Sequence, residues 1–168
     1  METFERETRV GGSFAKVWDF HSRISGLTGL TPDWMNMSVE SIRDPEGEPA
    51  PDLLEPDPGV LTAGCEIDIT VRPFGVGPQQ SWTSRIVARE EGEGAAFFRD
   101  EMVAGPFDRW VHSHYFYADE GGTRVRDRIE YRLPGSELGR LAGPFAVVGF
   151  EPMFQYRHRE TERLFDGR

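Results

Sequence analysis

The sequence of 168 residues contains one cysteine, one lysine and no long apolar run, and each of these scarcities excludes a class of protein. A lone Cys65 cannot form an internal disulfide, so the fold must depend on its apolar core. No apolar stretch approaches the roughly 20 residues that a membrane-spanning helix needs. The N-terminus is charged from Glu2 onward and does not have the pattern of a signal peptide. We therefore expect a cytoplasmic protein without a transmembrane segment.

Positive charge is scarce as well. There are 19 Lys and Arg against 29 Asp and Glu, which gives a formal net charge of −10, and Lys16 is the only lysine. Because a nucleic-acid partner requires a basic surface, the composition argues against one. An acidic composition with arginine in place of lysine is typical of a halophilic or GC-rich source. The length suffices to bury one core, so we expect residues 1–168 to form a single domain.

Signatures of several enzyme classes are also missing. The chain has no Gly-rich phosphate loop, no HExxH helix and no Ser–His–Asp order that indicates a nucleophilic triad. Cys65 belongs to no CxxC pair, and we interpret it as a small apolar residue on a strand face. Neither nucleotide chemistry nor covalent nucleophilic catalysis is indicated.

Apolar periodicity predicts a strand, two short helices, a run of strands and a terminal helix. Residues 2–10 form the first strand, Ser13 caps a helix that ends at Phe20 or His21, and a second helix ends near Leu30. The strands that follow are predicted at 35–42, 65–72, 80–89, 95–102, 109–118 and 123–133. Since consecutive strands tend to pair, one antiparallel sheet covered by the last helix follows from this order.

Proline marks two segments of this pattern. The last thirty residues have helical spacing, but Pro144 and Pro152 should kink or split that helix. Segment 44–59 contains five prolines and six acidic residues. It is longer than most connections, which is typical of a functional or a disordered loop.

Alternation assigns the faces of two strands. Cys65, Ile67, Ile69 and Val71 share one face of their strand. In the next strand, one face holds Trp82, Ser84, Ile86 and Ala88, and the other holds Arg85, Val87 and Arg89.

The segment Gly105–Phe116 concentrates aromatic rings and two of the four histidines behind a Gly-Pro turn. Trp110, His112, His114 and Phe116 alternate along one strand and therefore point the same way. Two ionisable rings between two apolar ones indicate either a polar spot in the core or the wall of a pocket.

A short hairpin at Asp119–Gly122 sets the partners of these residues. If Ala118 opposes Thr123, four further pairs follow: Phe116 with Val125, His114 with Asp127, His112 with Ile129, and Trp110 with Tyr131. The same register, carried back through the Gly-Pro turn, places Phe98 and Asp100 on this face near His112 and Trp110. A slip of one residue would turn Asp127 away.

Seven short stretches resemble one known superfamily. They are Val17–His21, Leu30–Pro32, Trp82–Ile86, Phe98–Asp100, Gly105–His114, Gly122–Asp127 and Phe154–Arg157. Together with the order of elements, they resemble the START-like or SRPBCC superfamily, which includes Bet v 1 allergens, lipid-transfer START domains and polyketide cyclases. The resemblance is greatest to bacterial and archaeal members labelled cyclase/dehydrase-like.

The resemblance implies an α+β helix-grip fold. In it a curved antiparallel sheet of about seven strands wraps around a long C-terminal helix, and two short helices follow the first strand. An apolar cavity is expected between sheet and helix, with the loops near 32–36 and 44–59 as its lids. Because this scaffold serves lipids, hormones, polyketides and cofactors, the resemblance indicates the fold more strongly than the chemistry.

Three interpretations of the polar face remain open. The groups can form a satisfied buried network, in which Asp127 accepts from His114 and Asp100 accepts from His112 or a backbone N–H. They can line the cavity and orient a ligand. They can also serve catalysis, with His112, His114 and Asp127 as candidates, either as a general base or as a two-histidine, one-carboxylate metal site. We predict no metal and no cofactor.

Three further residues complete the set. We expect His21 to form a hydrogen bond at a helix end and His158 to lie on a solvated face. Arg157 matches the superfamily's Tyr-Arg near the helix end, and we expect it to form a structural salt bridge, with a ligand anion as the alternative.

The predicted function is the binding of an apolar or aromatic small molecule of lipid-, polyketide- or hormone-like type. The residues predicted to bind it are Trp82, Phe98, Asp100, Trp110, His112, His114, Phe116, Asp127, Tyr131, Phe145 and Arg157. A cyclase/dehydratase-type enzyme with a His/Asp pair, and a non-catalytic interaction module with a filled core, are the alternatives. A homodimer is compatible with the sequence.

Overall fold

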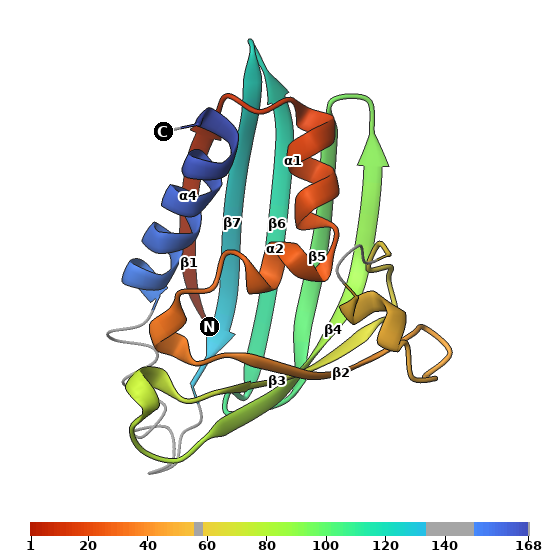
Figure 1. Ribbon diagram of the computed structural model, residues 1–168, viewed down its shortest axis with the longest axis vertical. Coiled ribbons are helices and arrows are strands. Elements are labelled where there is room, and N and C mark those ends of the chain that lie inside the picture. Colours follow the sequence, from red (N-terminus) through yellow and green to blue (C-terminus); the bar gives the residue numbers. More distant parts are fainter. Residues whose placement is uncertain (56–58, 134–149, 168) are drawn as a thin grey trace.

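The computed structural model describes residues 1–55, 59–133 and 150–167 (Figure 1). Seven antiparallel strands form one sheet in the order β1-β7-β6-β5-β4-β3-β2. Their bounds are Glu2–Val10 (β1), Ser38–Arg43 (β2), Glu66–Val71 (β3), Gln80–Gly92 (β4), Ala95–Ala104 (β5), Arg109–Asp119 (β6) and Gly122–Arg132 (β7). In Figure 1 the sheet bends, so that β2 and β3 run across the lower end of the other strands.

The three α-helices that the structure describes lie on one face of this sheet. Their bounds are Phe14–His21 (α1), Ile24–Thr28 (α2) and Phe150–Asp166 (α4). Helix α1 packs over β6 and β7, and α4 packs over β1 (Figure 1). Short 3-10 helices η1 (Asp33–Met35), η2 (Pro51–Leu54) and η3 (Pro73–Gly75) occupy the connections. The α+β helix-grip fold is thereby confirmed, including the two short helices after the first strand.

The helix boundaries follow the predicted signals. Ser13 is the N-cap of α1 with extended backbone, and its carbonyl accepts from the Val17 N–H at 3.1 Å. Pro152 lies in the first described turn of α4, and the described helix continues beyond it to Asp166. The first half of the predicted C-terminal helix, with Pro144 and Phe145, lies outside the described residues. None of the helices that the structure describes is long and apolar enough to cross a membrane.

The inner, helix-covered face of the sheet alternates as predicted in β3 but not throughout β4. Cys65, Ile67, Ile69 and Val71 are all buried. In β4 a bulge lies between Ile86 and Ala88, and it shifts the pleat by one residue. Arg89 consequently faces inward, opposite to the prediction.

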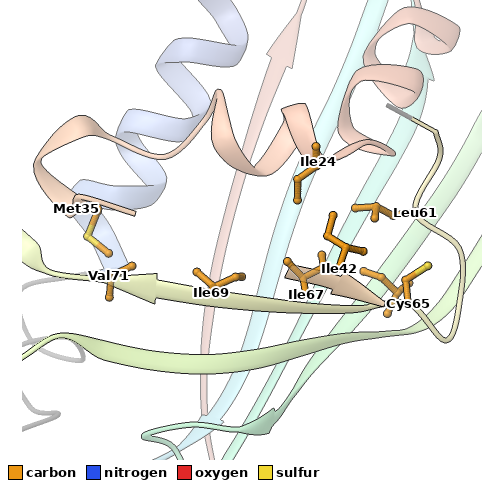
Figure 2. Packing of buried hydrophobic residues seen from close by; sticks show 9 residues of the cluster. Ile24, Met35, Ile42, Leu61, Cys65, Ile67, Ile69 and Val71 are labelled. Carbon is orange, nitrogen blue, oxygen red and sulfur yellow. The ribbon is translucent and has the colours of Figure 1, made fainter. Parts of the chain in front are cut away.

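Three clusters of apolar residues make up the core. Figure 2 shows the largest, in which Ile24 of α2 and Met35 of η1 meet the inner faces of β2 and β3. A second cluster lies beneath α1, around Phe116, and a third joins Phe154 of α4 to Ile129 of β7. The inner face of β6 carries His112 and His114, and the neighbouring β5 carries Asp100.

The acidic, proline-rich connection is structured over the part that the structure describes. The Asp44 carboxylate accepts from the N–H groups of Glu46 and Glu48, which closes a turn. Arg43 then bridges to Pro49, and η2 follows. Residues 56–58 of this connection lie outside the described ranges.

Candidate functional site

A cavity of about 150 Å³ lies between the inner face of the sheet and the elements α2, η1 and α4. Most of its wall is apolar: Leu27, Met35, Met37, Leu61, Ile67, Ile69, Val71, Trp82, Ile86, Phe98, Met102, Phe107, Trp110, Met153 and Phe154. The polar and charged side chains in the wall are His21, Arg23, Thr31, Gln80, Ser84, Asp100, His112, His114 and Arg157. An apolar wall with a smaller number of polar groups is typical of small-molecule sites.

Asp127 of β7 organises the polar side of this wall from behind. Its Oδ1 lies 2.8 Å from Nε2 of His112 and 3.0 Å from Nδ1 of His114, and its Oδ2 lies 2.7 Å from Nε2 of His158. Burial alone would raise the pKa of Asp127, but the hydrogen bonds from these three histidines hold that pKa well below its usual value. Asp127 is therefore a buried carboxylate, and each histidine turns a nitrogen toward it.

His114 lies between two carboxylates. Besides the contact to Asp127, its Nε2 lies 3.2 Å from Oδ2 of Asp100. Burial works against the charged ring, yet hydrogen bonds to Asp100 and Asp127 outweigh it and raise the pKa of His114. The two carboxylates favour the charged form of this ring, which links β5, β6 and β7 electrostatically.

His112 has the opposite character. Its Nε2 donates to Asp127, while its Nδ1 lies 3.9 Å from Oδ2 of Asp100, beyond hydrogen-bond reach. Burial, followed by the charge of His114, lowers the pKa of His112. The ring is therefore neutral at pH 7, with its proton on Nε2 and its lone pair on Nδ1.

The same groups have the donor set of a metal site. The ligand atoms of Asp100, His112 and His114 lie within 4.8 Å of one another. Two histidines and one carboxylate suit zinc or iron(II), and Asp127 stands where an outer-shell carboxylate would orient both rings. A protonated His114 between Asp100 and Asp127 accounts for the same close approach of these groups without a metal ion. Ser84 completes the site by donating to Oδ1 of Asp100 at 3.0 Å.

Arg157 brings a positive charge to the opposite wall, from α4. Its side chain is buried, with 8% of the residue exposed, and its Nε has no hydrogen-bond partner. Burial lowers the pKa of Arg157, and the charges of Asp127 and Asp100 oppose that shift. Within the described ranges it forms no ion pair, so the expected structural salt bridge is absent.

Sequence comparison assigns the chain to a family. Residues 10–152 match the profile of the family described as polyketide cyclase / dehydrase and lipid transport. The match covers more than half of the chain. The protein belongs to this family. No curated protein matches the sequence.

Solved structures similar to this polyketide cyclase / dehydrase family member share its fold at low identity. Truncated norcoclaurine synthase from Thalictrum flavum is 14% identical, covers 97% of this chain and 92% of its own, and has a TM-score of 0.61. A protein from Arthrobacter aurescens is 12% identical, with coverages of 99% and 87% and a TM-score of 0.64. A nucleoside-diphosphate sugar epimerase from Corynebacterium glutamicum is 18% identical over 95% of this chain and 28% of its own, with a TM-score of 0.58. Together with the family match, they support the START-like superfamily.

The cavity brings together most of the residues that the sequence predicts for ligand binding. Seven of them line it: Trp82, Phe98, Asp100, Trp110, His112, His114 and Arg157. Three described residues do not. Phe116 is fully buried against Trp18, Asp127 lies behind the histidines, and the Tyr131 hydroxyl donates to Glu2 of β1 at 2.7 Å. Phe145 lies outside the described residues.

The other histidines in this family member divide between confirmation and correction. His21 contacts the Val17 carbonyl oxygen at 2.7 Å through Nδ1, the hydrogen bond expected at a helix end. His158 is buried at 3% exposure rather than solvated, because position 158 faces the sheet one turn after Phe154. The charged neighbours of His158 in the sequence hid this. The 154, 157, 158, 161 spacing of α4 was the signal that could have revealed it.

Proposed function

We propose that the protein binds a small apolar or aromatic molecule in the cavity between the sheet and α4. One observation carries the proposal: an unfilled apolar space whose polar lining is concentrated on Asp100, His112, His114 and, across the cavity, Arg157. Such a division orients a ligand, because the apolar wall supplies affinity and the polar groups select one orientation. A filled-core interaction module is disfavoured by the same space.

The size of the cavity narrows the ligand class. Drug-sized ligands occupy roughly 300–1,000 Å³, whereas a cavity of about 150 Å³ accommodates benzene. We therefore favour a molecule with one ring, or an aliphatic body of similar volume, over a lipid or a multi-ring polyketide. We also infer that residues 1–168 form a single domain and that the protein is cytoplasmic.

Benzyl alcohol is a neutral probe of suitable size. In an NMR titration we expect it to shift the indole N–H signals of Trp82 and Trp110, which both line the cavity. Narrowing the space by Ile69→Phe should weaken this binding about tenfold or more, since the longer, rigid side chain projects into the space that the ring of the ligand would occupy. The control Val103→Phe adds the same ring at an exposed position and should leave binding unchanged. If neither benzyl alcohol nor a charged analogue of the same size binds the native protein, the proposal is refuted.

The second candidate function is cyclase/dehydratase-type proton transfer with a His/Asp pair. The specific observation is the Asp127–His112 pair, in which a neutral imidazole of the cavity wall donates from Nε2 to a carboxylate and keeps its lone pair on Nδ1. A general base needs this protonation state and a carboxylate that fixes its tautomer. One structural neighbour, norcoclaurine synthase, is itself described in complex with a transition-state analogue.

Deuterium exchange separates catalysis from binding. An enzyme of this type should accelerate exchange at the central carbon of acetylacetone in D₂O, and His112→Gln should abolish the acceleration. Asp127→Asn should reduce it strongly, because the ring loses the carboxylate that orients it. If the native protein binds the diketone without accelerating exchange, only the binding function stands.

A further inference from the structure

Arg157 is the one described cation of the cavity wall that the chain leaves without a counterion in contact. Only 8% of Arg157 is exposed to solvent, and its Nε has no hydrogen-bond partner. The other arginine of the wall, Arg23, pairs with Asp19 at 2.7 Å. Asp127 and Asp100 stabilise the charge of Arg157 only from a distance, and a buried N–H group without a hydrogen-bond partner still costs free energy. A binding protein that retains such a group has a use for it.

The nearby carboxylates are already committed. Asp127 is contacted by His112, His114 and His158, and Asp100 is contacted by His114 and Ser84. These partners occupy both oxygens of each carboxylate. Asp100 is also the only described acidic residue in the wall.

Aromatic rings do not compensate Arg157 either. The guanidinium groups that stack on rings in the described structure belong to Arg89, Arg99 and Arg126. Arg89, which also faces inward, has its guanidinium carbon 4.4 Å from the centre of the Trp18 ring and donates to Ser22. The guanidinium of Arg89 is therefore used by the fold, whereas Arg157 lines the cavity.

We propose that the ligand carries an acid group, which binds the guanidinium of Arg157 while its apolar body packs against Ile69 and Trp82. This inference rests on the proposed binding function and specifies its ligand as a small aromatic or aliphatic carboxylic acid. A carboxylate matches the planar fork of an arginine with two parallel hydrogen bonds. The apolar wall on the β3 and β4 side receives the remainder of the molecule.

Three probes of equal shape and different charge test this. Benzoate, benzyl alcohol and protonated benzylamine are titrated separately into the native protein at pH 7, with the Trp82 and Trp110 indole signals as the readout. We expect benzoate to bind at least about tenfold more tightly than benzyl alcohol, as a charge-assisted hydrogen bond supplies. Benzylamine should bind most weakly of the three.

Variants assign the preference to one side chain. Arg157→Gln should remove the advantage of benzoate and leave benzyl alcohol within about twofold of its native affinity. Arg157→Lys keeps the charge without the fork, and it should restore part of the preference. The matched control Arg159→Gln makes the same charge change at an exposed position of α4 and should leave all three affinities unchanged. Thermal unfolding of ligand-free Arg157→Gln should occur at the native temperature or higher, because no described ion pair is lost.

The outcomes separate the two proposals. If benzyl alcohol binds the native protein and benzoate binds no better, the cavity is a binding site and the acid preference is wrong. The same conclusion follows if Arg157→Gln leaves the preference for benzoate intact. If none of the three probes binds, the proposed function fails and this inference fails with it.

Discussion

Asp127 shows how much of the interior depends on one carboxylate. It lies at the middle of β7 and holds rings from two elements, His112 and His114 on β6 and His158 on α4. Asp68 on β3 is a natural comparison, because it also has three partners, Ser41, Thr83 and Arg43, but its side chain is 30% exposed. The two aspartates therefore differ mainly in access to water.

We expect Asp127→Asn to lower the free energy of unfolding by about 3–5 kcal/mol, because it removes the charged acceptor that three buried histidine rings contact in a dry interior. Asp68→Asn should cost about 1 kcal/mol, since water replaces its lost partners. Urea unfolding at pH 7 measures both changes. Equal losses in the two variants would mean that the network around Asp127 is not a buried one.

His21 provides a test of the interior through pH. Burial, partly offset by the hydrogen bond to Val17, lowers the pKa of His21 from 6.5 to about 3. The unfolded chain therefore binds this proton first, and stability is complete above pH 6.5 and is lost as the pH falls toward 3. The charges of Arg157, Asp127 and His114 also act on this ring.

At pH 5 the contribution of His21 to the loss is about 2 kcal/mol, from roughly 1.4 kcal/mol per pH unit. His21→Gln should lack this part of the acid sensitivity between pH 7 and pH 5. The pKa of His112 is lowered and that of His114 is raised, so they act in opposite directions, but both remain in the variant. The difference between the two urea profiles thus isolates His21, and parallel profiles would contradict its buried, neutral state.

At the scale of elements, the bulge in β4 determines which arginine enters the interior. The extra residue, Val87, is 39% exposed, and beyond it Arg89 turns inward over Trp18. Arg85, before the bulge, stays outside and pairs with Glu66. A strand without the bulge would place both arginines on the outer face.

We expect Arg89→Leu to destabilise the protein by about 1–2 kcal/mol, because the ring of Trp18 loses its cation and Ser22 loses a donor. Arg85→Leu should change stability by about 0.5 kcal/mol or less, since its pair is exposed. Thermal and urea unfolding of the two variants provide the comparison. A larger loss for Arg85→Leu would place the bulge elsewhere.

The hairpin of β6 and β7 was predictable residue by residue. The tight turn at Asp119–Gly122 fixes the pairing, and all five predicted pairs, from Ala118 with Thr123 to Trp110 with Tyr131, are confirmed. The turn before β6 is longer and less constrained. Phe98 therefore pairs with His114 and Asp100 with His112, two residues from the expected positions, although both remain on the predicted face.

Contacts between distant segments were the part of the site that the sequence could not provide. No glycine or proline near Val87 predicts the bulge from the sequence. The partner of His158 lies 31 residues away on β7, and its rotation depends on how α4 packs. Asp127 contacts His114 at 3.0 Å, as expected, but it lies still closer to His112, at 2.8 Å. Asp100 was expected to accept from His112, which is 3.9 Å away, and it is contacted by His114 instead.

For the whole molecule, the dominant electrostatic fact is the net charge of −10. Surface ion pairs such as Arg43–Asp68 and Arg126–Glu5 offset it locally, but the excess acid repels itself across the surface. Dissolved salt shortens the distance over which these charges repel one another.

We expect the midpoint of thermal unfolding to rise by a few degrees between about 0.02 M and 0.5 M NaCl, as screening relieves the excess charge. A variant with glutamine at the exposed positions Glu46, Glu48 and Glu55 should show a smaller rise, because three charges are removed from one connection. Scanning calorimetry of the two proteins across salt concentrations measures this. A fall in the midpoint with salt would show that ion pairs outweigh the net charge.

The hydrogen bond between His158 and Asp127 holds α4 against the sheet as one wall of the cavity. Moving α4 away would break this bond and leave a buried carboxylate and a buried ring without each other. In contrast, α2 and η1 face the cavity mainly through apolar side chains. A ligand should therefore enter the cavity by displacement of α2 and η1, while α4 stays in place. Amide hydrogen exchange should accordingly find α4 as slow as β7, and the 24–35 segment much faster.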